Sequence, residues 1–331
     1  MYKEVQFHPQ DVSLKDSVFL VTGGAGFIGS HIVEYLLCHG AGKVKVLDNL
    51  SEGRISNLDH LNHHAALEFT EGDCCNTQLV QSLMEGVHYV SHQAALGSVP
   101  RSIKTPLATN EANVTGFLNV LNAAREAGVK QMVYASSSSV YGDHPQLPKV
   151  EHQTGNLLSP YAVSKMVNEL YASVFHRTYG MQVCGLRYFN IFGPRQRPDG
   201  PYAAVIPLFI SAIRANQPVH INGDGLQTRD FTYVENAVQA NIRALFPKRD
   251  DAMGRVYNVA VGERVTVLKM YEMLCQLAEV KPQAIHRADR EGDIRDSLAD
   301  ISAGGNFLGY NPEVKMEAGL RRTFSWFLNN Q

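Results

Sequence analysis

The 331-residue sequence predicts an α/β fold in which a doubly wound parallel sheet carries a smaller C-terminal lobe. Short β-branched runs alternate with amphipathic stretches through the first half of the chain, a rhythm typical of parallel strands joined by helices. After about residue 185 this alternation loosens, and Gly- and Pro-rich turns crowd residues 193–225. Apolar residues make up 44% of the chain, enough to bury a sizeable core.

The hydrophobic pattern places the individual elements of the first half. We expect strands at residues 18–21, 43–47, 67–71, 87–92 and 131–135, and helices at 27–39, 77–84, 115–127 and 160–179. The side chains that bind ligands in such a sheet lie beyond the carboxyl ends of its strands, so the segments that follow each strand are the first candidates for a site.

Charge and cysteine content exclude several classes of protein. The net charge is −2 and the pI about 6.7, so we expect no nucleic acid and no membrane as partner. The chain has five cysteines and no CxxC pair, so we expect neither a disulfide framework nor a metal site. Such cysteine usage is typical of a reducing compartment and predicts a cytoplasmic location. The N-terminal stretch is too polar for a signal peptide, and no apolar run reaches membrane-spanning length.

A glycine triplet lies between the first predicted strand and helix. In VFLVTGGAGFIGS, Gly23 permits a tight turn, Gly26 lets a pyrophosphate approach the backbone, and Gly29 lets helix and strand pack closely. The helix N-terminus then offers free N–H groups and a positive dipole end to phosphates. The pattern predicts a Rossmann-type dinucleotide site.

Asp48 follows the second strand, 22 positions after Gly26 (48 − 26), where a carboxylate accepts hydrogen bonds from the adenosine ribose. Such a carboxylate would repel a 2′-phosphate, which favours NAD over NADP, although nearby Arg54 weakens this preference. The alternative is an aspartate that caps a helix.

Further residues at strand ends complete the predicted cofactor site. Asp73 can meet the adenine, and Gln93 with Ala94 offers close passage to the dinucleotide, although both segments could be ordinary strand ends. The remaining candidate cofactor contacts are Phe27, Ile28, Asn49, Gly53 and Cys74.

The predicted NAD-binding domain is residues 1–185, joined by parts of 228–260, and residues 186–331 mainly form the substrate lobe.

The segment LLSPYAVSKMVNELYASVFHRTYG carries the candidate catalytic groups. Ser159 and Pro160 suit the start of a helix, and Tyr161 and Lys165 are then neighbours on one face. The lysine and the helix N-terminus should favour the phenolate, the form that a general base requires. The alternative is a surface tyrosine beside a solvated lysine. The serine run at 136–139 after the fifth strand can hydrogen-bond the reacting oxygen, unless it is only a flexible turn.

These features together resemble the extended short-chain dehydrogenase/reductase family over nearly the whole chain. The matching motifs are TGGAGFIG, the position of Asp48, the serine run, YAVSK and LRYFNIFGPRQ. The resemblance implies tightly held NAD, with Ser137 as the catalytic serine beside Ser138, Tyr161 as the base and Lys165 holding the nicotinamide ribose. By the same resemblance Phe189 contacts the nicotinamide region.

The resemblance also implies a reaction type. Related 4,6-dehydratases carry an Asp-Glu pair beside the catalytic hydroxyl, and related decarboxylases a glutamate, whereas residues 136–140 here contain no acid. This favours a 4-epimerase. The stretches ALGSVPRSI, YGDHPQLPKVE and DIRDSLAD resemble bacterial UDP-N-acetylglucosamine/UDP-N-acetylgalactosamine 4-epimerases of surface-polysaccharide pathways. There Ser297 maps to the gate beside the C2 substituent and leaves room for an N-acetyl group, unless it is merely a small turn residue.

The same subgroup implies a set of substrate contacts. Asn190 and Ser98 would meet the sugar or its phosphate, and arginines would hold the UDP phosphates or ribose. His220 departs from the aromatic expected at its position, and Phe209 from a larger one, which weakens the expected uracil stacking. The implied substrate residues beyond Ser137 and Tyr161 are Ser98, Asn190, Ala204, Val205, His220, Asn222, Arg229, Arg264, Arg290, Asp293 and Ser297.

Rival functions remain open at this point. A UDP-glucose 4-epimerase is the nearest, a UDP-uronate 4-epimerase would need a cation near C6, and a catalytically inactive NAD-binding regulator would lack turnover altogether. Helices 115–127 and 161–179 bear apolar residues beyond one face. In the family such helices pair across a two-fold axis, so we expect a homodimer.

Overall fold

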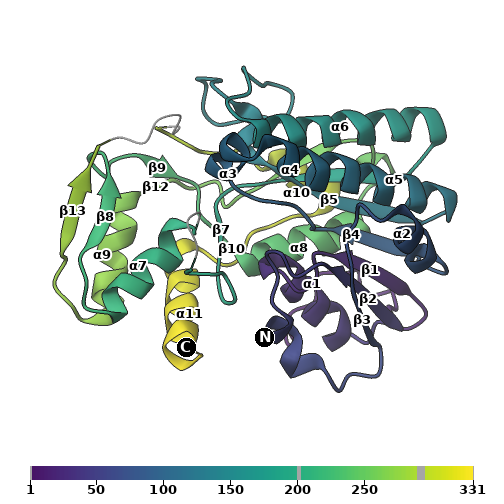
Figure 1. Ribbon diagram of the computed structural model, residues 1–331, viewed down its shortest axis with the longest axis horizontal. Coiled ribbons are helices and arrows are strands. Elements are labelled where there is room, and N and C mark those ends of the chain that lie inside the picture. Colours follow the sequence, from purple (N-terminus) through teal and green to yellow (C-terminus); the bar gives the residue numbers. More distant parts are fainter. Residues whose placement is uncertain (1, 200–202, 289–294, 331) are drawn as a thin grey trace.

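The larger part of the molecule is a seven-stranded, entirely parallel sheet in the order β11-β6-β5-β4-β1-β2-β3. The computed structural model describes residues 2–199, 203–288 and 295–330. Helices cover both faces of the sheet, and the smaller lobe lies beside it (Figure 1). This is the doubly wound fold that the sequence predicts.

The five strands and four helices for which ranges were predicted agree with the structure to within two residues. The strands are β1 (Val18–Thr22), β2 (Lys43–Asp48), β3 (Leu67–Glu71), β4 (Tyr89–His92), β5 (Gln131–Ser137), β6 (Val183–Tyr188) and β11 (Val256–Val259). The helices are α1 (Phe27–Cys38), α2 (Thr77–Met84), α3 (Val99–Lys104), α4 (Pro106–Asn110), α5 (Gly116–Glu126), α6 (Pro160–Tyr179), α8 (Val234–Leu245) and α10 (Ser302–Leu308), with a π-helical turn at Glu111–Thr115 and 3-10 turns at Ile55–Leu61, Ser138–Tyr141 and Asp250–Ala252.

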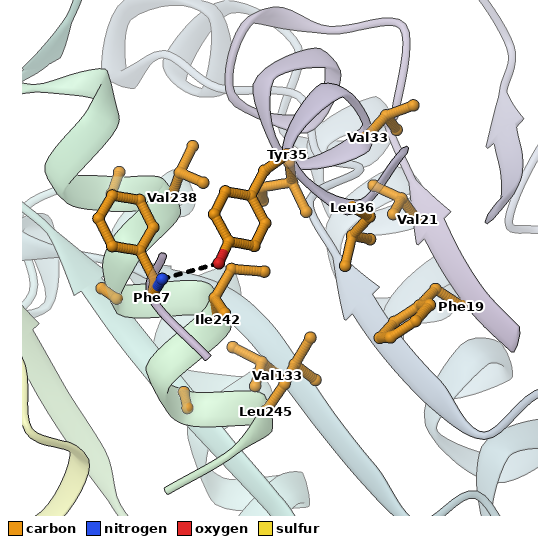
Figure 2. Close-up of a cluster of buried hydrophobic side chains, with 14 of the residues drawn as sticks. Phe7, Phe19, Val21, Val33, Tyr35, Leu36, Val133, Val238, Ile242 and Leu245 are labelled. Atoms are coloured by element: carbon orange, nitrogen blue, oxygen red, sulfur yellow. Dashed lines mark hydrogen bonds between the residues drawn. The ribbon is translucent and has the colours of Figure 1, made fainter. Parts of the chain in front are cut away.

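Alternation along the strands divides the core between the two faces. On β1, Phe19 and Val21 pack with α1 and α8, whereas Leu20 packs with α2 and α5 on the other face. Residues 2–14 run over the α1–α8 side, where the backbone N–H of Phe7 donates to the Tyr35 hydroxyl at 2.7 Å (Figure 2). Buried aromatic side chains thus hold the N-terminal segment against the first helix.

The sheet is not confined to the first half of the chain. Strand β6 continues to Tyr188, past the predicted boundary at residue 185, so that boundary falls inside a strand. Residues 234–259 form helix α8 and strand β11, and β11 pairs with β6 at the edge of the sheet. Both elements lie within residues 228–260, part of which we expected to belong to the NAD-binding domain.

The smaller lobe has a core of its own, formed by α7, β8, α9 and α11 with strand β10. Phe27 and Ile28, at the start of α1, pack against it and so connect the two parts. The lobe elements are β7 (Ile191–Phe192), α7 (Val205–Arg214), β8 (Val219–Asn222), β9 (Thr228–Arg229), β10 (Thr232–Tyr233), β12 (Val265–Thr266), α9 (Val267–Ala278), β13 (Ala284–Arg287) and α11 (Met316–Asn329). None of the helices in the described ranges is long and apolar enough to cross a membrane.

Candidate active site

A cavity of about 810 Å³ lies beyond the carboxyl ends of the sheet strands. Its volume is typical of small-molecule sites, and its place is that expected of ligands in open α/β sheets. The predicted residues that line it are Gly23, Gly26, Phe27, Ile28, Gly29, Asp48, Asn49, Gly53, Asp73, Cys74, Gln93, Ala94, Ser137, Tyr161, Lys165, Asn190 and Ala204. The structure therefore brings the glycine loop and the Tyr–Lys pair to one cavity.

The glycine loop after β1 is packed so closely that side chains would not fit. Gly23 has φ +66°, and a Cβ there would lie 2.7 Å from the backbone nitrogen of Ala94. A Cβ on Gly29 would lie 2.2 Å from the carbonyl oxygen of Gly23. Helix α1 begins after Gly26 without a side-chain cap, so its first N–H groups face the cavity free to bind an anion.

Asp48 is held by backbone groups rather than acting as a helix cap. Its carboxylate accepts hydrogen bonds from the N–H groups of Ala25 and Leu50, both at 2.9 Å. Burial raises the pKa of Asp48, and the backbone hydrogen bonds oppose this shift. Each oxygen keeps lone pairs for ribose hydroxyls. Arg54, the residue that weakened the NAD prediction, forms an ion pair with Asp199 at 2.5 Å.

A second carboxylate lies at the expected adenine end of the cavity. Asp73 accepts hydrogen bonds from the Cys75 N–H at 2.8 Å and from the Asn49 amide at 2.7 Å. Burial raises its pKa, but these hydrogen bonds outweigh burial, and the pKa of Asp73 is lowered overall. An uncapped helix end, two placed carboxylates and a cavity of this size fit a dinucleotide.

The opening turns of α6 place the catalytic pair as predicted. The Ser159 hydroxyl caps the helix by accepting from the Ala162 N–H at 3.1 Å, and Pro160 takes the first helical position. The side chain of Lys165 is almost fully buried, and its ammonium donates to the carbonyl oxygen of Ala135 at 2.7 Å. This ammonium lies 6.0 Å from the Tyr161 ring centre, so the pair is not a solvated surface pair.

The pKa of Tyr161 is shifted in the direction opposite to the prediction. Burial raises the pKa of Tyr161, and a hydrogen bond with Ser137 only partly opposes it. The pKa of Tyr161 therefore lies above its ordinary value in the protein alone, opposite to the predicted lowering, because burial disfavours the charged phenolate. Burial also lowers the pKa of Lys165 to about 8, since no solvent stabilises its charge.

The serine run contributes one residue of the predicted pair to the cavity. Ser137 lines the cavity, and its hydroxyl oxygen accepts from the backbone N–H of Ser139 at 3.2 Å. Ser138 begins a 3-10 turn and does not line the cavity. Phe189 is fully buried against Tyr141 and also stays outside, while its neighbour Tyr188 lines the cavity.

Most of the implied substrate contacts lie outside this cavity. Ser98 caps α3, where its hydroxyl accepts from the Arg101 N–H at 3.2 Å. Arg229 donates to the carbonyl oxygens of Thr228 and Arg295, and the Ser297 N–H donates to the same Thr228 carbonyl at 3.2 Å. The described residues of this group that do not line the cavity are Ser98, Val205, His220, Asn222, Arg229, Arg264 and Ser297. Arg290 and Asp293 lie outside the described residues.

Asp230 connects the segments that carry the implied substrate contacts. Its buried carboxylate accepts hydrogen bonds from the N–H groups of Val261 at 2.9 Å, Gly262 at 3.1 Å and Ala299 at 3.3 Å. The Asn190 side-chain amide donates to the Asp230 carbonyl oxygen at 3.1 Å. The residue therefore holds three distant parts of the chain beside Arg229 and Ser297.

Three arginines of the cavity wall were not singled out from the sequence. Arg101 forms an ion pair with Glu52 at 2.5 Å, and Arg197 one with Asp199 at 3.2 Å. Arg195 is tied to Glu34 of α1 at 2.6 Å. The basic run GPRQRP was the available signal for two of them. In the described parts of the chain, no group of three or more His, Cys, Asp or Glu side chains could hold a metal ion.

Comparison with known proteins connects this site to enzymes of nucleotide-sugar chemistry. A putative UDP-glucose 4-epimerase from Methanocaldococcus jannaschii is 37% identical, over 95% of this chain and 99% of its own length. A UDP-glucuronate 4-epimerase from Thermodesulfobacterium geofontis is 32% identical, over 94% and 96% respectively.

The chain is also similar to a solved structure of a UDP-sugar 4-epimerase. The UDP-N-acetylglucosamine 4-epimerase from Methanobrevibacter ruminantium, in complex with UDP-N-acetylmuramic acid, is similar with a TM-score of 0.90 and 40% identity. The match covers 96% of this chain and all of that one. The model of the NAD dependent epimerase/dehydratase family matches residues 19–260. The resemblance inferred from the sequence and the predicted cofactor are thereby confirmed, and the chain belongs to the NAD-dependent epimerase/dehydratase family.

Proposed function

We propose that this NAD-dependent enzyme reversibly inverts the C4 hydroxyl of UDP-N-acetylglucosamine to give UDP-N-acetylgalactosamine. One observation carries the epimerase chemistry: Ser137, Tyr161 and Lys165 line the same cavity as the glycine loop and Asp48. A hydroxyl-bearing carbon beside Tyr161 would then lie within the site that receives the cofactor. The UDP-sugar 4-epimerases among the relatives support the same chemistry.

The residues of the chain account for the proton transfer. Tyr161 takes the proton of the C4 hydroxyl, while Ser137 hydrogen-bonds the reacting oxygen. When bound, NAD supplies the hydride acceptor and a positive charge that favours the phenolate of Tyr161. The 4-keto sugar turns over within the cavity, so that the hydride returns to the opposite face of C4, and Tyr161 returns the proton to the C4 oxygen. Lys165, held by the Ala135 carbonyl, keeps a positive charge beside the phenol.

The glycine loop, Asp48 and Asp73 would hold the cofactor. The free N–H groups at the start of α1 suit its pyrophosphate, Asp48 its adenosine ribose, and Asp73 its adenine end. Remote contacts to UDP, proposed for Arg229 and Arg264, would keep the ketone from escaping. Residues 136–140 bring no carboxylate to this point, which favours epimerisation over elimination of water.

The N-acetylated substrate is proposed on the small size of Ser297 and on the UDP-N-acetylglucosamine 4-epimerase among the similar structures. The uronate alternative needs a cation for the C6 carboxylate. Arg101 and Arg197 line the cavity, but each is paired with a carboxylate, Glu52 and Asp199 respectively. These pairs leave less positive charge for a uronate.

The deciding experiment incubates the purified protein separately with UDP-N-acetylglucosamine, UDP-glucose and UDP-glucuronate, and resolves the epimers by chromatography. Conversion of the acetylated sugar with the highest kcat/KM supports the proposal. Preference for UDP-glucose or UDP-glucuronate replaces the substrate by that sugar. NAD binding without turnover of any of them would favour the regulator.

We also propose a homodimer built on α6. Val163, Leu170 and Val174 form an exposed apolar row on this helix, and Leu107 of α4 is 85% exposed nearby in the fold. Contiguous exposed apolar surface of this kind marks interfaces. Light scattering should give twice the chain mass of 36.6 kDa, and a strictly monomeric protein would refute the assignment.

A further inference from the structure

The catalytic face of α6 extends one turn beyond Lys165. Tyr161, Lys165 and Glu169 are spaced four residues apart, so their side chains lie above one another on the same side of the helix. That side faces the end of β5. Lys165 donates to the Ala135 carbonyl at 2.7 Å, and the Ser136 hydroxyl donates to the Glu169 carboxylate at 2.5 Å.

Successive residues of β5 thus meet successive turns of α6. Ala135 is joined to Lys165, Ser136 to Glu169, and Ser137 to Tyr161. Two of these three connections belong to the machinery already described. The third joins Ser136, which lines the cavity, to Glu169, which does not.

The Glu169 carboxylate is clamped from a third element. Arg187 of β6 binds it through two nitrogens, at 2.9 Å to one oxygen and 2.7 Å to the other. The two side chains are only 7% and 3% exposed. Arg187 also donates to the Glu151 carbonyl at 2.9 Å, and its guanidinium lies 4.8 Å from the Tyr141 ring centre. The fork geometry therefore fixes the direction of the carboxylate.

Stability alone is a weak reason for such a pair. Removing two charges from water costs several kcal/mol per ion, and well-packed apolar residues of similar volume are often as stabilising or more so. The pair does provide a fixed geometry, since one carboxylate joins α6, β5 and β6. That junction lies one residue from Ser137 and one helical turn from Lys165.

We propose that Glu169 is a positioning residue for the proton transfer at C4, in which its carboxylate, clamped by Arg187, fixes Ser136 and thereby the adjacent Ser137 while holding Lys165 in place. The inference rests on the proposed function. Glu169 touches neither substrate nor cofactor and acts through the catalytic groups beside it.

The electrostatics of Lys165 agree with this role. Burial lowers the pKa of Lys165 to about 8, and the negative charge of Glu169 opposes the shift. The other titratable groups that face the ammonium are Tyr161, whose pKa is raised by burial, and His92 of β4, whose pKa is lowered by burial to about 3. Both are uncharged near neutrality. The negative charge of Glu169 therefore favours the protonated form of the ammonium.

The first test is Glu169→Gln, which keeps the volume and removes the charge. We expect kcat to fall about 10- to 100-fold, the loss typical of reacting groups displaced by up to about 1 Å, with little change in KM. The alkaline limb of the kcat profile should move to lower pH. Ser136→Ala should lower kcat without changing Tm much. Glu272→Gln, which breaks an exposed pair with Lys269, serves as the matched control.

The second test separates positioning from simple stabilisation. In the double variant Glu169→Leu/Arg187→Met, apolar side chains replace the buried ion pair. Its Tm should be higher than that of Glu169→Leu alone, in which Arg187 is left buried without a partner charge. We expect kcat to stay low in this double variant. Recovery of kcat together with Tm would overturn the proposal, as would an unchanged kcat in Glu169→Gln. If the double variant does not fold, unchanged kcat in Ser136→Ala overturns it.

A third readout does not need the proposed substrate. Nitrogen NMR of ¹⁵N-lysine-labelled protein with NAD bound follows the Lys165 ammonium, assigned with Lys165→Arg. In Glu169→Gln its pKa should be lower than in the wild type. If the wild type converts none of the three UDP-sugars, the proposed function fails, and this titration decides the role of Glu169 by itself: an equal pKa in both proteins would refute it.

Discussion

Gly29→Ala tests whether NAD binding requires the start of α1 to pack directly against the backbone of the glycine loop. The new Cβ would lie 2.2 Å from the Gly23 carbonyl oxygen and 2.8 Å from the Gly24 Cα, all of it backbone. Ordinary contacts of a Cβ begin at 3.4 Å, so the helix start must retreat by about 1.2 Å (3.4 − 2.2). Overpacking of this size costs about 1–3 kcal/mol of folding free energy.

The same retreat should weaken NAD binding, because the N–H groups at the start of α1 leave the pyrophosphate. A loss of about 1.4–2.8 kcal/mol corresponds to a 10- to 100-fold higher Kd for NAD. Thermal unfolding measures the first effect, and calorimetric titration of cofactor-stripped protein measures the second.

Gly305→Ala is the matched control for this experiment. Gly305 lies inside α10, and a Cβ there would meet only the Tyr310 carbonyl oxygen, at an ordinary 3.5 Å. This variant should equal or exceed the wild type in Tm, since alanine favours a helix over glycine. If Gly29→Ala kept both the Tm and the NAD affinity of the wild type, the steric explanation of the glycine loop would be wrong.

Three further predictions concern the base, the substrate gate and the lobe. Tyr161→Phe should keep its fold and its NAD while kcat drops by about 10²–10⁴-fold, and unchanged turnover would remove its assigned role. Ser297→Tyr should reduce kcat/KM for UDP-N-acetylglucosamine more than for UDP-glucose; equal losses contradict the gate. Burial raises the pKa of Asp230 to about 6, against hydrogen bonds from Val261 and its partners, whereas the unfolded carboxyl ionises near 3.8. The folded state therefore binds the extra proton between these values, and the stability contributed by Asp230 is lost as pH rises. Relative to Asp230→Asn, the wild-type free energy of unfolding should drop by about 3 kcal/mol between about pH 4 and pH 7 in urea titrations, and a pH-independent difference would refute this.

Local patterns were sufficient to predict five of the seven strands of the sheet, four of the helices around it, and the glycine loop and Asp48 that line the cavity. Strand and helix periodicity is a property of neighbouring residues, and glycines or an aspartate at a strand end act where they stand in the chain. The contact of Phe189 with the nicotinamide region was implied by the family resemblance alone, and in the structure its neighbour Tyr188 lines the cavity instead.

The residues that depend on long-range contacts were harder to predict. A glutamate within an amphipathic helix is usually solvated, so nothing marked Glu169 before β5 and β6 were placed against it. The lobe contacts depend on Asp230 holding Val261 and Ala299, partners that lie 31 and 69 residues away. The energetic balance at Tyr161 was also out of reach, because it depends on burial rather than on spacing.

The position of β11 late in the sequence has a consequence for folding during synthesis of the chain. This edge strand pairs with β6, and α8 covers the sheet beneath it, yet both follow α7 and β8 of the lobe along the chain. On a translating ribosome, the face of the sheet that α8 shields stays open to solvent until Leu245 has left the exit tunnel, and the edge of β6 stays unpaired until Val259 has left it. We therefore expect nascent chains stalled before that point to bind chaperones, and protease resistance to appear abruptly once it is passed.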